Sequence, residues 1–321
     1  MSALPPPGRP VFEPVDRIPS LAALREAVRR RDWDAVRTGI ETLSSEDGRA
    51  LACRIVAETD GAETFLQSQA DRSPDDPLAR TMLADRLVQI GWAIRSGHRA
   101  EHVSKDQFRD FHAYLRRAEL LLIDVCAEHP EYALAWYLRT ITARGLELGL
   151  SETRRRYDRL AEHHPHHYSG QQQLLQQVCP KWGGSWEAAH GFARQCAAEA
   201  PAGSPAGSLV AVAQMEQYLE LSQKESRSRA ETYLRQPETH AQLLDAAARS
   251  VFHPDFRADA PHAVSAHSAF AAAHCAAGRH AEAAPHFRAL GNGATEFPWG
   301  YLSNDHEAVF VHHRKTALAK G

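Results

Sequence analysis

Three stretches that share one sequence pattern predict the fold: RRAELLLIDVCAEHPEYALAW (Arg116–Trp136), RRRYDRLAEHHPHHYSGQQQ (Arg154–Gln173) and GFARQCAAEAPAGSPAGSL (Gly191–Leu209). Each has the pattern of an amphipathic helix that ends in Ala-Glu and a nearby proline, before a short turn and a new helix. The three prolines, at positions 130, 165 and 201, are separated by 35 and 36 residues. This spacing indicates a repeated unit of two helices.

A repeat of this length has a simple physical basis. Two helices and their two turns occupy about 34 residues, and such a pair cannot bury its apolar face alone. It therefore stacks on the next pair, and small residues such as Ala118 and Ala189 allow the helices to approach closely. The proline removes a backbone donor and ends the second helix. The repeat predicts an all-α fold, a right-handed α-solenoid of antiparallel helix pairs.

The same pattern continues toward the N-terminus. Leu78–Arg95 and Phe108–Glu128 are both apolar on one side, and Pro130 ends the second of them. The polar stretch Ser96–Gln107 between them predicts a loop or an inserted turn. Alanine supplies about one residue in six, and it is the best helix former. Alternating runs of valine, isoleucine and threonine, which would indicate strands, are nearly absent.

Three regions are expected along the chain. Residues 1–19 carry six prolines and predict a flexible, extended N-terminal arm. Residues 20–290 form the helical repeat domain, which begins with Ser20 as a helix cap, and Asp32 or Asp34 starts the second helix. Residues 291–321 are expected to pack on the last repeat and to end in a short basic tail.

One C-terminal stretch, SAFAAAHCAAGRHAEAAPHFRAL, carries a resemblance to a known family. Gly278 falls in its turn, and Ala283 and Phe287 follow at the small and aromatic positions of a second helix. Pro285 fits this pattern near the first turn of that helix. On these residues, and on Trp136 in an earlier unit, the chain resembles tetratricopeptide-repeat proteins over roughly Ser20 to Leu290. The resemblance implies a concave face lined by the first helix of each pair.

The most distinctive segment is CPKWGGSWE (Cys179–Glu187). Its two glycines interrupt the helix, and Ser185 is placed to cap the next one. Together with GWAIRSGH and AWYLRTITARGLELG, it resembles a bacterial, actinomycete-type family of tetratricopeptide-like proteins. That family has no assigned activity, so the resemblance implies the fold and offers no catalytic residue. The segment itself fits either a packed inter-helix turn or a ligand loop in which Lys181 and Trp182 hold an anion or an aromatic group.

Composition excludes several classes of protein. The chain has 321 residues, of which 43% are hydrophobic and 24% charged, ordinary values for a soluble folded protein. Its formal net charge of −3 argues against a dedicated nucleic-acid binder. No stretch approaches 18 uncharged apolar residues, so no membrane partner is expected. With no apolar signal-peptide core and no CxxC pair among five cysteines, a cytoplasmic location is the simplest prediction.

The chain has no motif for a catalytic residue, a cofactor or a metal site. GxSxG, HExxH, GxGxxG and the Walker spacing are absent. The run HHPHH (His163–His167) suggests adventitious nickel or zinc binding, but it lies in a predicted turn without a nearby carboxylate or cysteine arranged for a fixed site. His267 and His274 are interpreted as packing residues of one helix face.

Helical spacing places a candidate binding face on two successive units. Its aromatic, guanidinium and amide groups are of the kind that bind peptide backbones and carboxylates. The face comprises Tyr137, Arg144, Gln173 and Gln177, with Lys181 and Trp182 at its edge.

The expected function is a non-catalytic scaffold that binds a protein or peptide on the concave face of the array, which is an inference by fold analogy. The alternative is an enzyme or a biosynthetic accessory protein that binds a small molecule in the groove. A third possibility is a regulator that senses a ligand through the array. A deep pocket with clustered His, Asp, Glu or Lys favours the enzyme, and an open groove favours the scaffold.

Overall fold

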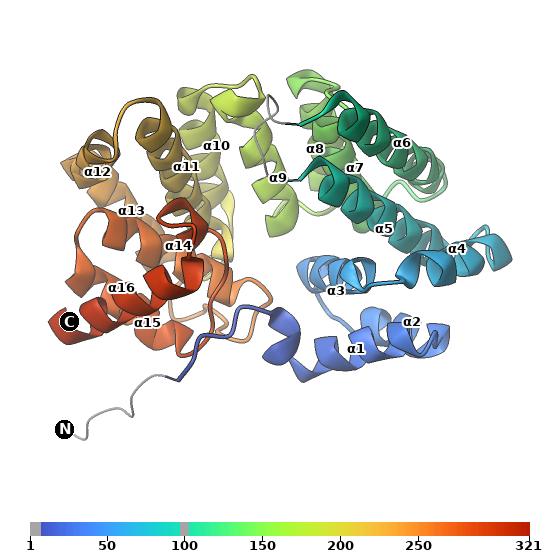
Figure 1. Ribbon diagram of the computed structural model, residues 1–321, viewed down its shortest axis with the longest axis horizontal. Coiled ribbons are helices and arrows are strands. Elements are labelled where there is room, and N and C mark those ends of the chain that lie inside the picture. Colours follow the sequence, from blue (N-terminus) through green and yellow to red (C-terminus); the bar gives the residue numbers. More distant parts are fainter. Residues whose placement is uncertain (1–7, 97–102) are drawn as a thin grey trace. The chain divides into compact units, whose positions relative to one another are not determined.

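The computed structural model describes residues 8–96 and 103–321 (Figure 1). About 75% of the protein is helical, and the described residues form 16 α-helices and no strand. The prediction of an all-α protein is therefore confirmed.

The chain divides into two compact units. Residues 18–184 form the first, here called the inserted unit. Residues 8–17 and Ser185–Gly321 form the second, here called the terminal unit because it contains both ends of the chain. The sequence predicted one repeat domain over residues 20–290. The boundary between Gly184 and Ser185 instead falls inside that range, within the CPKWGGSWE segment.

The described residues of the inserted unit form nine α-helices and a short 3-10 helix. They are α1 (Pro19–Arg29), α2 (Trp33–Glu41), α3 (Glu46–Glu58), α4 (Ala62–Arg72), α5 (Pro77–Arg95), α6 (Lys105–Glu128), α7 (Ala133–Gly145), α8 (Leu150–His163), α9 (Tyr168–Val178) and η3 (Pro180–Trp182).

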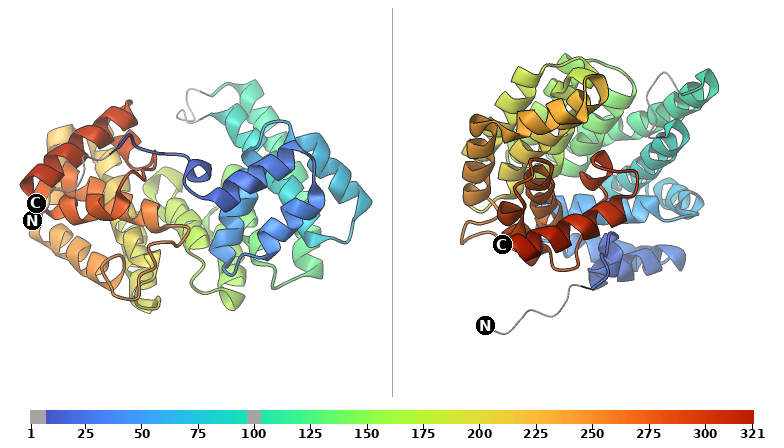
Figure 2. Two further views of the ribbon diagram at one scale, coloured as in Figure 1. Left: turned by 90° about the horizontal axis from the view of Figure 1, so that it is seen from below. Right: turned by 60° about the vertical axis from the view of Figure 1, so that its left-hand side comes forward.

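Two kinds of contact organise the inserted unit (Figures 1 and 2). Each helix packs on the next along the chain, most extensively in the α5–α6 pair. In addition, the alternate helices α1, α3, α5, α7 and α9 contact one another in succession. Alternate helices therefore carry the contacts from one helix pair to the next.

Side-chain caps explain where several of these helices begin. Asp32 accepts a hydrogen bond from the amide of Ala35 at the start of α2, as predicted. Ser104 and Gln107 form a capping box at the start of α6. The prediction of Ser20 as a cap is wrong, because α1 begins at Pro19, whose fixed φ suits the first helical position. Part of the predicted polar insertion, residues 97–102, lies outside the described residues.

An acidic side chain connects α3 directly to α9, the last helix of the alternate-helix series. Asp47, in the first turn of α3, accepts hydrogen bonds from the amides of Tyr168 and Ser169 at 3.0 and 2.8 Å. The Ser169 hydroxyl donates to the same carboxylate at 2.7 Å. A carboxylate is favourable at this position because the first amides of a helix carry partial positive charge. The contact fixes the start of α9 against α3.

A buried charge cluster joins α6, α7 and α8. The Glu119 carboxylate accepts hydrogen bonds from the guanidinium groups of Arg139, at 3.0 Å, and Arg156, at 2.9 Å. The Thr142 hydroxyl donates to the same carboxylate. All four residues are buried, so each charge depends on these partners in place of water.

The terminal unit contains seven α-helices and three 3-10 helices among its described residues. They are η1 (Pro14–Asp16), α10 (Trp186–Glu199), η4 (Pro205–Gly207), α11 (Ser208–Lys224), α12 (Arg227–Arg235), α13 (Pro237–Arg249), α14 (Ala263–Ala276), α15 (His280–Leu290), η5 (Trp299–Tyr301) and α16 (His306–Lys320).

Residues 8–17 are packed, in contrast to the prediction of a flexible arm over residues 1–19, of which residues 1–7 lie outside the described residues. Val11 exchanges backbone hydrogen bonds with Asn292 and Ala294. Phe12 packs against Phe310, with ring centroids 6.1 Å apart, and Val15 is buried. Residues 8–17 therefore lie along the C-terminal segment, at the blue and red ends of the colour scale in Figure 2. Because these contacting residues are far apart in the sequence, no local sequence pattern predicts that they pack together.

The C-terminal segment packs on the last helix pair, and the basic residues predicted for its tail lie in a helix. Residues 306–320 form α16, which packs against α15. Phe310 and Ala317 are fully buried on its inner face. The short stretch after the predicted repeat domain is therefore part of the core of the terminal unit.

The predicted hairpin near the C-terminus forms as α14 and α15. Ala283 and Phe287 are buried, and Gly278 occupies the left-handed region in the turn with φ of +78°. Pro285 was expected near the first turn of the second helix. It is instead the sixth residue of α15.

Candidate functional site

The predicted binding residues meet in the structure, but mainly as packing partners. The Arg144 guanidinium lies beside the rings of Trp92 and Trp182, 5.7 and 5.6 Å from their centroids. It also donates to the backbone oxygen of Gln173 at 3.4 Å. The Gln177 amide donates to the backbone oxygen of Trp182 at 3.0 Å. These contacts attach η3 to α5, α7 and α9.

Exposure corrects the idea of an open binding face on α7. The side chain of Tyr137 is only 7% exposed and that of Gln177 only 4%. Burial raises the pKa of Tyr137 to about 12. Every residue of α7 from Ala133 to Ala143 is buried, so this helix has no solvent-facing stripe. Among the six predicted residues, Lys181 is exposed, while Arg144, Gln173 and Trp182 are half-buried.

Arg144→Ala should lower the stability of the inserted unit by about 1–2 kcal/mol, because it removes a cation from two partly desolvated indole rings. Urea unfolding followed by circular dichroism measures the change. Arg159→Ala is the matched control, because Arg159 is exposed and pairs with exposed Glu162. If both variants unfolded like the wild type, the Arg144 guanidinium would contribute no packing energy.

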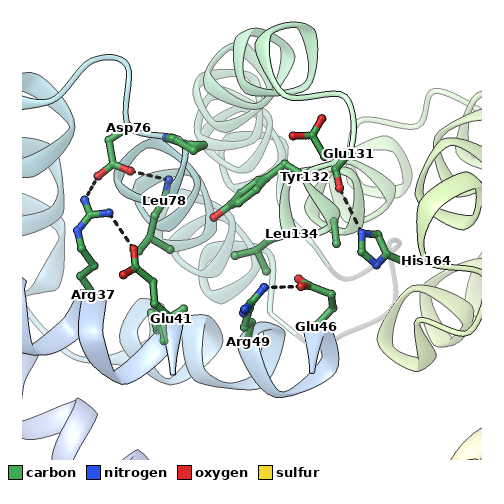
Figure 3. Close-up of a pocket in the computed structure, with 13 residues that line it drawn as sticks. Arg37, Glu41, Glu46, Arg49, Asp76, Leu78, Glu131, Tyr132, Leu134 and His164 are labelled. Atoms are coloured by element: carbon green, nitrogen blue, oxygen red, sulfur yellow. Dashed lines mark hydrogen bonds and ion pairs between the residues drawn. The ribbon is translucent and has the colours of Figure 1, made fainter. Parts of the chain in front are cut away.

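A more open site lies at the starts of several helices of the inserted unit. This α2–α7 cavity has a volume of about 450 Å³ and is shown in Figure 3. Its apolar floor is formed by Ile40, Pro77, Leu78, Ala133 and Leu134. Its polar rim is formed by Arg37, Glu41, Glu46, Arg49, Asp76, Glu131, Tyr132 and His164.

The charged groups of the cavity largely pair with one another. Arg37 bridges Glu41 and Asp76, and Arg49 pairs with Glu46. Four carboxylates and two guanidinium groups nevertheless leave the lining with a net charge of −2 when His164 is neutral. The cavity therefore favours a cation over an anion.

Tyr132 supplies a hydrogen-bonding group inside the cavity. Its hydroxyl extends toward the middle of the space (Figure 3). Burial, with added repulsion from Asp76 and Glu46, raises the pKa of this phenol far above its usual value. The hydroxyl therefore keeps its proton and can donate to a carbonyl oxygen.

The titratable groups of the cavity are carboxylates, guanidinium groups, a phenol and an imidazole. Among the described residues that line it there is no serine, threonine, cysteine or lysine. His164 contacts the backbone oxygen of Glu131 at 3.2 Å. The sequence reasoning missed this site because it searched for stripes along helices, whereas the lining residues cluster at helix ends. The Asp76-Pro77 pair, a cap followed by a proline, was an available signal.

The histidine-rich run at 163–167 serves mainly local structure. The ring of His167 accepts a hydrogen bond from the amide of Gly170 and caps α9, and His163 is the last residue of α8. In the described parts of the chain, no metal-binding geometry includes this run.

Comparison with known proteins adds no family assignment: no protein-family model matches the chain, and no curated protein matches it significantly. None of the described helices is both long enough and apolar enough to cross a membrane. Fold and site together define an all-helical protein with a charged, partly apolar cavity.

Proposed function

We propose that the inserted unit is a tetratricopeptide-like solenoid and that its α2–α7 cavity binds a segment of another protein through a basic side chain. One observation carries the proposal: an apolar floor lies beneath a rim of net negative charge, and both are built from the ends of successive helices. The cytoplasm remains the location that we propose for this role.

Two features support the solenoid. The prolines at 130 and 165 are 35 residues apart, close to the tetratricopeptide period of about 34. Alternate helices contact one another in succession while each also packs on its neighbour. Pairs of helices that each bury a face against the next pair produce this pattern of contacts.

The chemistry of the cavity suits a lysine or arginine side chain. The long apolar stem of such a residue can lie on Ile40 and Leu134 while its charged end reaches the carboxylates. The Tyr132 hydroxyl can donate to a backbone oxygen of the same segment. This combination recognises both the side chain and the peptide bond.

A small cationic molecule is the alternative ligand, because the cavity volume of about 450 Å³ falls in the range of small-molecule sites. Agmatine separates the two possibilities, since it has the guanidinium and alkyl stem of arginine but no peptide backbone. A peptide site should bind its best peptide at least about tenfold more tightly than agmatine.

The test is a positional-scanning hexapeptide library measured against the full chain by fluorescence polarisation. We expect selection of arginine or lysine at one position. Glu41→Gln should weaken the selected peptide by about 3–10-fold, because a partly exposed charge contributes about 0.5–1.4 kcal/mol. Arg37 keeps Asp76 as a partner in that variant, so the fold is preserved.

Two further variants sharpen the result. Tyr132→Phe removes only the hydroxyl and should also weaken binding. Glu162→Gln removes an exposed carboxylate outside the cavity and should leave binding unchanged. Selection of acidic peptides, or equal binding by all three variants and the wild type, would exclude the proposed role.

A further inference from the structure

Three metal-binding side chains converge in the terminal unit, on three different helices. They are His240 of α13, His274 of α14 and Glu282 of α15, and their ligand atoms all lie within 4.8 Å of one another. His240 Nε2 donates to Glu282 Oε2 at 2.6 Å, and His274 Nδ1 lies 3.3 Å from the same oxygen. One carboxylate oxygen therefore faces two imidazole nitrogens.

His274 gives an independent sign that this cluster has a ligand. Its side chain is 1% exposed, and its buried Nδ1 atom has no hydrogen-bond partner among the described residues. Leaving a buried polar atom without a partner is costly, so native proteins do so rarely.

The surroundings of Glu282 orient the site and leave it accessible. Arg279 lies 3.9 Å from Oε1, so Oε2 is left to face the histidines. The Glu282 side chain is 35% exposed and that of His240 21%, which provides a path for an ion and room for water as a fourth ligand. The ring of His286 stacks on that of His274, with centroids 5.7 Å apart.

We propose that His240, His274 and Glu282 bind a divalent transition-metal ion, with zinc as the best match. Two imidazole nitrogens and one carboxylate oxygen form a common zinc ligand set, whereas calcium and magnesium prefer oxygen alone. In tetrahedral zinc sites neighbouring ligand atoms are about 3.3 Å apart. The His274–Glu282 distance already has this value, and the His240–Glu282 pair needs to open by less than about 1 Å.

A neighbouring group provides the natural control. Cys275, His280 and His313 also place their ligand atoms within 4.8 Å of one another. Cys275 is buried, and it must lose its proton to bind a metal. The two groups share no residue, so they can be removed separately. The site lies in the terminal unit and does not depend on the proposed peptide cavity.

The test uses the full chain after removal of metals with a chelator. Zinc alone is titrated by calorimetry, and cobalt(II) is titrated in parallel by visible absorption. We expect one tight equivalent with a dissociation constant below about 10 μM and intense cobalt bands of a four-coordinate site. His240→Gln and Glu282→Gln should each weaken binding at least about 100-fold, since both remove a direct ligand.

Both substituted residues are partly exposed, so circular dichroism should show folded variants. His280→Gln, in the neighbouring group, and His164→Gln, in the surface histidine run, should keep wild-type affinity. Zinc should raise the melting temperature of the wild type and of these controls, but not that of His240→Gln. Loss of binding in His280→Gln with retention in His240→Gln, or only millimolar affinity throughout, would overturn the assignment.

Discussion

Glu119→Gln should lower the free energy of unfolding of the inserted unit by about 3–5 kcal/mol, the usual result of removing one partner from a buried ion pair. The Glu119 carboxylate is 8% exposed and accepts hydrogen bonds from two buried arginines and a threonine. Without its charge, buried Arg139 loses the carboxylate that pairs with it, while Arg156 still pairs with Glu152. Urea unfolding of the full chain, followed by circular dichroism, measures the loss.

Glu162→Gln is the matched control for this experiment. It breaks an ion pair with Arg159 in which both side chains are more than half exposed, so its effect should stay within about 1 kcal/mol. Equal stability of the two variants would mean that the α6–α8 charge cluster is no more stabilising than a surface pair.

The second large effect concerns the glycine at the end of the inserted unit. In Gly184→Ala, the new Cβ atom would lie 1.9 Å from the backbone oxygen of Val178, so the backbone must move. Overpacking of this kind costs about 1–3 kcal/mol. We expect a lower urea midpoint for the inserted unit, with the slope of the transition unchanged.

Gly191→Ala should have the opposite sign. Gly191 lies inside α10, and a Cβ atom there meets nothing within 4 Å apart from its own helix. Alanine is more favourable than glycine within a helix by about 0.5–1 kcal/mol, so this variant should be more stable than the wild type. A destabilised Gly191→Ala together with a neutral Gly184→Ala would contradict the described backbone at both positions.

The helices were predictable because their signals are local. Leu115, Ala118 and Leu122 follow a period of 3.6 residues, and all three are buried in α6. Ser185 caps α10 as predicted, and its hydroxyl accepts a hydrogen bond from the amide of Ala188. Such caps depend only on residues three positions apart.

The binding face was not predictable in the same way. A binding stripe on α7 requires one buried and one exposed side, but residues on all sides of this helix are buried. In such a helix, the spacing of the apolar residues does not show which side faces solvent. The α2–α7 cavity and the His240–His274–Glu282 group each combine residues from separate helices. Only the packing of those helices brings the side chains together.

The division of the chain has a consequence for its biosynthesis. The inserted unit is complete in sequence once Gly184 has been added, and domains generally fold as they are synthesised. Residues 8–17 are synthesised before the inserted unit, yet their partners are Asn292, Ala294 and residues of α16. This segment can therefore be buried only after the C-terminal helix has been made, and it stays unpacked while the inserted unit folds.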